Sequence, residues 1–252
     1  MMNTNALKEL LFKIADDQLI LGHRNSEWTG MGPLLEEDIA FSSMAQDKIG
    51  QSLALYTILQ GLGEADPDRL AFTRQASAFR NCIFVELPNG EYDFSLIRHF
   101  LYDTAIAIRF GLLCESSFKP IADLSRKISA ELKYHTLHAN TWIKQLGSAT
   151  EESISRLQTS LDLAAPYARG MFESSPFEAE LIDAKILVGE SVIEQQWREA
   201  VGNVLAETEL NAPHWDRIDA IVGGRVGQHS EHLQPLLDEM SEVFRIDPTA
   251  EW

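Results

Sequence analysis

Sustained helical periodicity is the feature that most constrains the fold of this chain. Apolar residues recur every three or four positions over long stretches, and no stretch sustains the alternation of apolar and polar residues that is typical of a strand. The pattern predicts four long helices within the first 146 residues, over about 5–23, 33–61, 94–115 and 119–145. Helices of this length are typical of bundles, so we expect an all-α fold whose core, about residues 5–146, is a four-helix bundle.

Shorter helical patterns fill the rest of the chain, over about 149–246. Asp66 followed by Pro67 predicts the start of a short helix, because aspartate caps a helix and proline suits its first position. Ser148 and Glu151 have the spacing of a capping box before the next helix. We find no repeat, low-complexity tract or linker, and therefore predict one domain over 1–252 in which the later helices pack onto the core.

The composition excludes several classes of partner. The chain has 252 residues, with 38 acidic and 21 basic side chains that give a formal charge of −17, which repels nucleic acids and anionic membranes. No apolar run is long enough to cross a bilayer, and the first residues do not resemble a secretory signal, so we expect a cytoplasmic protein. The two cysteines are too few for a disulfide framework and indicate reduced, buried thiols.

A metal-binding pattern is incomplete in the predicted core. Ferritin-like di-iron bundles take their ligands in the order acid, Glu-x-x-His, acid, Glu-x-x-His, because side chains three apart on a helix share one face. None of the seven histidines here has an acid three residues before it. We therefore expect no metal, catalytic or cofactor-binding residue in this chain, and interpret six positions as a degenerate site: Asp16 (or its neighbour Asp17), Lys48, Gln51, Asp103, Leu132 and His135.

Lys48 is the most informative of these positions. A lysine ammonium has no lone pair and repels a cation, so it is a poor ligand. One hypothesis is that Lys48 takes the place of the positive charge of the metal, between carboxylates such as Asp16 and Asp103. The alternative is that Lys48 extends to the surface and Asp103 is an exposed acid.

The segment GGRVGQHSEH, residues 223–232, also contains candidate ligands. His229 and His232 are one helical turn apart, but the segment lacks a third ligand and the glycine spacing of a phosphate-binding loop. We instead expect the glycines to turn the chain into a helix capped by Ser230, with the histidines packing or bonding at a contact between subunits.

Many short stretches together resemble the structural C-type subunits of the bacterial phenylacetyl-CoA epoxidase, a multicomponent monooxygenase. The resemblance covers nearly the whole chain and ends at Trp252. The matching stretches, in order, are ADDQLILGHRNSEWTGMGPLLEEDIAFSSMAQDKIGQSLALY, DRLAFTR, VELPNGEYDFSLIRHFLYD, KYH, WREAVGNVLAETELNAP and GGRVGQHSEHLQPLLDEM.

The resemblance implies a ferritin-like helical subunit with a degraded di-iron site and additional C-terminal helices. It also implies a partner, the catalytic A-type subunit, which retains its metal ligands and epoxidises the aromatic ring of phenylacetyl-CoA. A small B-type subunit and a reductase that carries flavin and iron–sulfur groups complete that system. By this analogy the chain supports aerobic phenylacetate breakdown without a cofactor of its own.

Two other functions stay open at this point. The chain could be a self-sufficient ferritin-like di-metal oxidase or oxygenase with atypical ligands, or a stand-alone helical protein such as a ligand-binding bundle. A scaffold protein should behave poorly alone, or self-associate, because obligate contacts between subunits bury large apolar areas.

Overall fold

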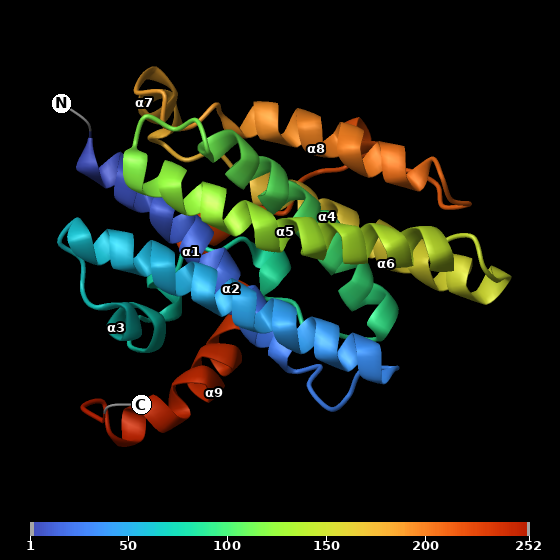
Figure 1. Cartoon of the computed structure of the whole chain (residues 1–252), viewed down its shortest axis with the longest axis horizontal. Coiled ribbons are helices and arrows are strands. Elements are labelled where there is room, and N and C mark those ends of the chain that lie inside the picture. Colours follow the sequence, from blue (N-terminus) through green and yellow to red (C-terminus); the bar gives the residue numbers. More distant parts are fainter. Residues whose placement is uncertain (1–2, 251–252) are drawn as a thin grey trace. The chain divides into compact units, whose positions relative to one another are not determined.

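A computed structural model describes residues 3–250 of the chain, so Trp252 lies outside the described residues (Figure 1). The all-α prediction is confirmed, and no strand occurs within this range. The α-helices are α1 (Thr4–Ser26), α2 (Leu35–Gly61), α3 (Pro67–Phe72), α4 (Tyr92–Leu113), α5 (Lys119–Leu146), α6 (Glu151–Arg169), α7 (Glu178–Asp183), α8 (Glu190–Leu205) and α9 (Leu233–Ile246). Five single turns of 3₁₀-helix lie at Ala76–Ala78, Ile83–Val85, Gly170–Phe172, Trp215–Arg217 and Gly224–Val226.

The chain divides into two compact units, which we describe separately. Unit 1 contains residues 3–6 and 89–222, and unit 2 contains residues 7–88 and 223–250. The four long helices predicted for the core are shared between them, with α4 and α5 in unit 1 and α2 and most of α1 in unit 2. The prediction of one domain over 1–252 stays a prediction.

Helix α4 is the centre of unit 1. It packs against α5, α6 and α8 (Figure 1), and every residue from Phe94 to Ile106 is buried. A helix that is buried on all sides lacks a polar face, which explains why the apolar pattern of α4 is nearly continuous. Trp197 of α8 lies against α4 and donates a hydrogen bond from Nε1 to the carbonyl oxygen of Leu101 at 2.8 Å. Its ring also contacts the rings of Phe172 and Trp215.

Unit 2 joins the beginning and the end of the chain. Helix α3 contacts both α2 and α9, and the rings of Phe72 and Phe244 lie 5.4 Å apart. Asp66 caps α3 as predicted, since its side chain accepts a hydrogen bond from the backbone N–H of Arg69 at 3.0 Å. Both cysteines of the chain are free; Cys82, in this unit, is buried, whereas Cys114 of unit 1 is half-buried.

The predicted capping box before α6 is wrong in its residues. Thr150 is the N-cap, and it exchanges hydrogen bonds with Ser153, while Glu151 is exposed in the first turn of the helix. The spacing of a capping box fits both pairs, and the structure uses the serine in place of the more common glutamate. The helix therefore begins at Glu151, two residues later than Ser148 would require.

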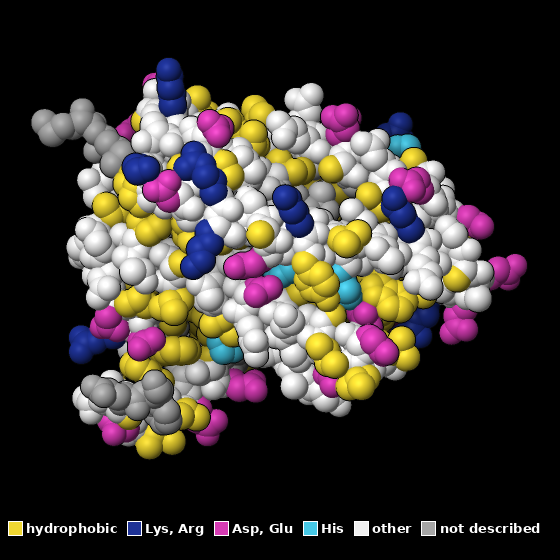
Figure 2. Space-filling model, viewed as in Figure 1, with side chains coloured by type: hydrophobic (Ala, Val, Ile, Leu, Met, Phe, Trp, Pro, Cys, Tyr) yellow, Lys and Arg dark blue, Asp and Glu magenta, His cyan; other side chains and the backbone are white. Residues whose placement is uncertain are grey.

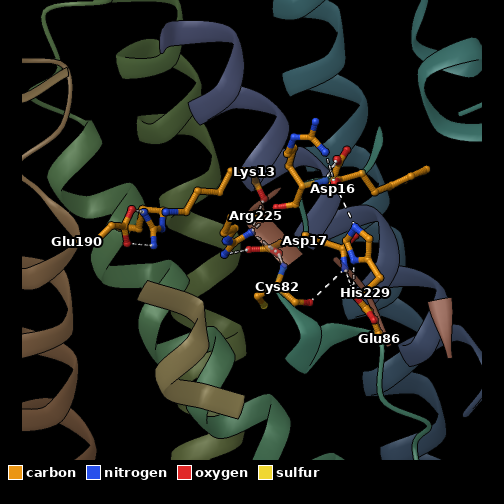
Figure 3. A network of polar contacts seen from close by, with 12 residues as sticks. Lys13, Asp16, Asp17, Cys82, Glu86, Glu190, Arg225 and His229 are labelled. Carbon is orange, nitrogen blue, oxygen red and sulfur yellow. Dashed lines mark hydrogen bonds and ion pairs between the residues drawn. The ribbon is translucent and has the colours of Figure 1, made fainter. Parts of the chain in front are cut away.

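His229 of the segment 223–232 bonds within its own unit, and the predicted contact of the two histidines with another subunit stays a prediction. His229 Nδ1 lies 2.5 Å from Glu86 Oε1 within unit 2, and Glu86 also accepts hydrogen bonds from the backbone and the hydroxyl of Ser230 (Figure 3). Ser230 therefore bonds Glu86 instead of capping α9, whose N-cap is His232. A buried carboxylate needs such donors, and the C-terminal segment supplies them.

Within residues 3–250, every helix is too short or too polar to span a lipid bilayer.

Candidate functional site

All six predicted positions of the degenerate site are buried and helical. The lysine at position 48 has 0% of its surface exposed, so the alternative in which it extends into solvent is wrong, as is an exposed Asp103. That the six residues form one degenerate metal site stays a prediction, because three lie in each unit. They are Asp16 on α1, Lys48 and Gln51 on α2, Asp103 on α4, and Leu132 and His135 on α5.

Asp16 takes part in a salt bridge with Arg74 in unit 2. Its carboxylate accepts hydrogen bonds from the Arg74 guanidinium at 2.5 and 3.0 Å, from the Tyr56 hydroxyl at 2.5 Å and from the backbone N–H of Arg80 at 2.7 Å. Burial, together with the charge of Asp16, raises the pKa of Tyr56 well above its usual value, so the phenol stays protonated and donates. Arg74 is therefore a cation that neutralises Asp16, while the hypothesis that Lys48 lies between carboxylates stays a prediction.

Asp17, the predicted alternative to Asp16, also forms a buried salt bridge. Arg225 donates to both of its carboxylate oxygens at 2.8 Å, and the backbone N–H of Cys82 donates to Oδ1 at 2.7 Å (Figure 3). Burial raises the pKa of the Cys82 thiol, with a further contribution from Asp17, so it stays protonated. Both aspartates are thus buried partners of arginines that lie far away in the sequence.

Gln18 of α1 contacts the predicted motif on α2, and the sequence interpretation missed it. Its Nε2 donates to Gln51 Oε1 at 2.7 Å, and both side chains are buried. A signal for it exists, because Gln18 continues the helical stripe of Leu11, Ile14 and Leu21 at the one position of that stripe that is polar. In unit 2, Gln18 therefore joins the predicted positions Asp16, Lys48 and Gln51 as a buried polar residue.

A second buried polar cluster lies in unit 1, between α4 and α5. Asp103 Oδ2 lies 2.6 Å from His99 Nδ1, and Asp103 Oδ1 lies 3.2 Å from His135 Nδ1. His99 Nε2 is in turn 3.2 Å from Nδ1 of the half-buried His138. The structure thus brings the predicted pair Asp103 and His135 together, and adds His99, which lies one turn before Asp103 on α4.

The donor atoms present do not suit a di-iron centre. An ionised carboxylate accepts only, so Asp103 engages both imidazoles through their Nδ1–H groups. Leu132, one turn before His135, offers no ligand atom, and the ammonium of Lys48 has no lone pair. Across residues 3–250, no three or more His, Cys, Asp or Glu side chains are grouped in a way that could hold a metal ion.

Lys48 provides a test of how a buried cation contributes to stability. An ammonium without exposed surface has to be hydrogen-bonded inside the protein. We expect Lys48→Met, which keeps the length of the side chain but leaves those acceptors without a donor, to lower the free energy of unfolding by about 2 kcal/mol in urea denaturation. Lys144→Met is the control, since Lys144 is partly exposed beside Glu207 and should change stability by less than about 0.5 kcal/mol. Unchanged or higher stability of Lys48→Met would mean that burying the charge costs more than its contacts contribute.

Comparisons with known proteins agree with the arrangement of the helices and with the resemblance noted in the sequence. The model of the family described as "Phenylacetic acid catabolic protein" matches residues 1–252. The chain is 30% identical over 249 residues to the C subunit of the 1,2-phenylacetyl-CoA epoxidase of Escherichia coli (strain K12), an alignment that covers 98% of this chain and 100% of the relative. The predicted ferritin-like class of the all-α fold is thereby confirmed. The chain belongs to the phenylacetic acid catabolic protein family.

Proposed function

We propose that this chain is a non-catalytic structural subunit of a multicomponent phenylacetyl-CoA epoxidase. Its similarity to the C subunit of such an enzyme along its full length supports a role in phenylacetate catabolism. The observation that supports the non-catalytic part is the buried Lys48, whose predicted place in the bundle is that of a chelating glutamate. In this proposal the chain works in the cytoplasm and holds no cofactor of its own.

The partner in this proposal is the catalytic A-type subunit, which holds the di-iron centre. The chain supports that subunit through contacts and contributes no ligand to the metals. The B-type subunit and the reductase with its flavin and iron–sulfur groups belong to the same proposed assembly. The ordered, buried salt bridges of Asp16 and Asp17 suit a scaffold, because they fix helices without leaving a reactive group open.

A self-sufficient di-metal oxidase is the competing function, and the cluster around Asp103 is the observation that favours it. Three imidazoles and a carboxylate form a chain of hydrogen-bonded pairs there, from His135 through Asp103 and His99 to His138. Against this, Asp103 already accepts from Nδ1 of both His99 and His135, and Leu132, one turn before His135, offers no ligand atom. A structural role is compatible with Lys48 and Leu132 at the predicted metal-site positions, whereas an oxidase would need metal ligands there.

Iron analysis and reconstitution separate the two functions. We expect the chain, purified from cells grown with added iron, to contain iron far below stoichiometry and to epoxidise no phenylacetyl-CoA by itself. Co-expression with the A-type subunit of its own host should yield a stable complex in which removal of this chain abolishes epoxidation. The matched control is the A-type subunit purified in the same way, which should retain its iron. Near-stoichiometric iron in the isolated chain, with oxygen-dependent turnover, would contradict the proposal.

A further inference from the structure

The outward face of α2 exposes no charged residue over most of its length. From Ile39 onward every exposed residue of this helix is uncharged, and Asp47 is half-buried, although the chain as a whole has a net charge of −17. Apart from Gly61 at the end of the helix, these exposed residues follow one another at helical spacing and form what we call the uncharged face of α2: Ile39, Ser43, Gln46, Ile49, Gly50, Leu53, Thr57 and Gln60. The face is ~32 Å long at 1.5 Å per residue.

An exposed helix face normally carries the charged residues of a protein. Charged side chains are rarely buried, so they collect on the face that water reaches. On α2 that face instead presents Ile39 and Leu53, which are 60% and 52% exposed. The hydroxyl of Thr57 bonds the carbonyl oxygen of Leu53 within the helix, so it does not need water either. White and yellow side chains dominate the visible surface over the middle of α2 in Figure 2. Depletion of charge with exposed apolar side chains is typical of the centre of a protein interface.

Gly50 indicates what kind of element covers the face. Glycine inside a helix is destabilising relative to alanine, so its presence needs a reason. Apart from its chain neighbours and the backbone of its own helix, a Cβ atom at Gly50 would meet no atom within 4 Å, so no packing within the described chain requires glycine there. A glycine allows a second backbone to approach closely, and Gly50 lies between the exposed side chains of Ile49 and Leu53. The resulting notch between apolar side chains suits a helix that crosses α2.

The face is also asymmetric along its length, which argues against a second copy of the chain. Exposed apolar residues continue from Ile39 back through Leu35 to Met31, whereas the opposite end carries Thr57 and Gln60. A two-fold axis that pairs α2 with itself in antiparallel orientation would place the apolar end of one copy on the polar end of the other. A second copy would also bring another 17 negative charges.

We propose that the uncharged face of α2 is the surface that binds the catalytic A-type subunit, through a helix of that subunit with apolar and small residues. The inference rests on the proposed function and assigns its contact surface. The inner face of the same helix carries Lys48 and Gln51, so α2 presents its degenerate positions to the core and its outward face to the partner.

Two variants of the full chain test this surface in complexes with the A-type subunit of its own host. Gly50→Leu fills the notch, and Leu53→Lys adds a charge. Each should weaken binding of the A-type subunit at least roughly tenfold, as expected for residues at the centre of an interface. Because the space at Gly50 is open, Gly50→Leu should retain or raise the melting temperature of the isolated chain.

Matched controls are available in unit 1. Gly202 is also a helical glycine with open space at its Cβ, but Arg198 and Glu199 precede it by one turn, and Leu163 is 57% exposed. Gly202→Leu and Leu163→Lys should leave the complex intact. Binding that survives both α2 variants would overturn the inference while the proposed function stands. A wild-type chain that does not bind the A-type subunit at all would overturn the proposed function together with the inference. A homodimer of the chain that dissociates in Gly50→Leu, beside an intact complex, would instead assign the face to a second copy.

Discussion

Replacing Arg225 with methionine is expected to lower the free energy of unfolding by about 3–5 kcal/mol, the usual cost of removing one member of a buried ion pair. The guanidinium donates to both oxygens of Asp17 and to the carbonyl oxygens of Lys13 and Arg80. Both charged side chains of the pair are almost fully buried. Without Arg225, the carboxylate of Asp17 keeps the backbone N–H of Cys82 but loses its compensating charge.

The measurement is urea denaturation combined with hydrogen exchange of residues 223–250. Arg225 fastens the segment before α9 to α1, so exchange should accelerate in α9 before the protein unfolds globally. The double variant Arg225→Met with Asp17→Leu should recover much of the loss, because it removes the stranded carboxylate as well. Arg245→Met is the exposed control: its partner Asp238 is also exposed, and the change should stay within about 0.5 kcal/mol. An equal loss in the single and double variants would show that packing of the arginine, and not its charge, holds the segment.

Most of the helices could be predicted from the sequence because their apolar residues repeat at helical spacing. The predicted helix over 119–145 differs from α5 by one residue, and Pro67 marks the start of α3. Helix ends depend on which of several side chains actually reaches the backbone, and the sequence does not decide between Ser148 and Thr150 as the cap of α6. Local spacing therefore predicts the existence of a helix better than its first residue.

Helical spacing was enough to predict which positions of the candidate site are buried, and it also placed Asp103 and His135 on neighbouring helices where they meet. Lys48 and Leu132 occupy buried helical positions, as their spacing indicated. On α1 the prediction of Asp16 or Asp17 stays a prediction, and it left out Gln18, because the helix is buried on nearly all sides and also turns this residue toward Gln51. The cations that neutralise Asp16 and Asp17 come from loops 58 and 208 residues away, and no local pattern connects residues so distant.

The exposed face of α2 could not be identified from the sequence. Its residues are unremarkable one by one, since single exposed apolar side chains are common on protein surfaces. Only the assignment of inward and outward positions along α2 shows that the charged residue Lys48 is buried while Ile39 and Leu53 are exposed. On α2 a charged residue is therefore inside and apolar residues are outside. Neither arrangement stabilises an isolated protein, so the pattern fits a subunit that works in a complex.

Replacing Glu190 with glutamine is expected to lower the free energy of unfolding by about 3 kcal/mol or more, because it breaks a buried ion pair within unit 1. Glu190 is the first residue of α8. Its carboxylate accepts two hydrogen bonds from the guanidinium of Arg109 on α4, at 2.6 and 2.7 Å, and both side chains are buried. A glutamine retains the size of the side chain and one acceptor oxygen, but leaves the guanidinium buried without its charge partner. Because α4 also carries Asp103 and His99, the pair fixes the helix on which the histidine cluster is built.

Tryptophan fluorescence provides the measurement for Glu190→Gln, because Trp197 of α8 is buried against α4 and reports directly on the packing of these two helices. We expect its unfolding transition to move to lower urea concentration, with a control in Glu207→Gln, whose exposed pair with Lys144 should contribute less than about 0.5 kcal/mol. Replacing both partners, by Arg109→Met with Glu190→Leu, should restore much of the stability, since no isolated charge then remains inside. If Glu190→Gln is as stable as the parent chain, the charge of the pair does not contribute to stability. The packing of α8 on α4 would then depend on Trp197 and the rings around it.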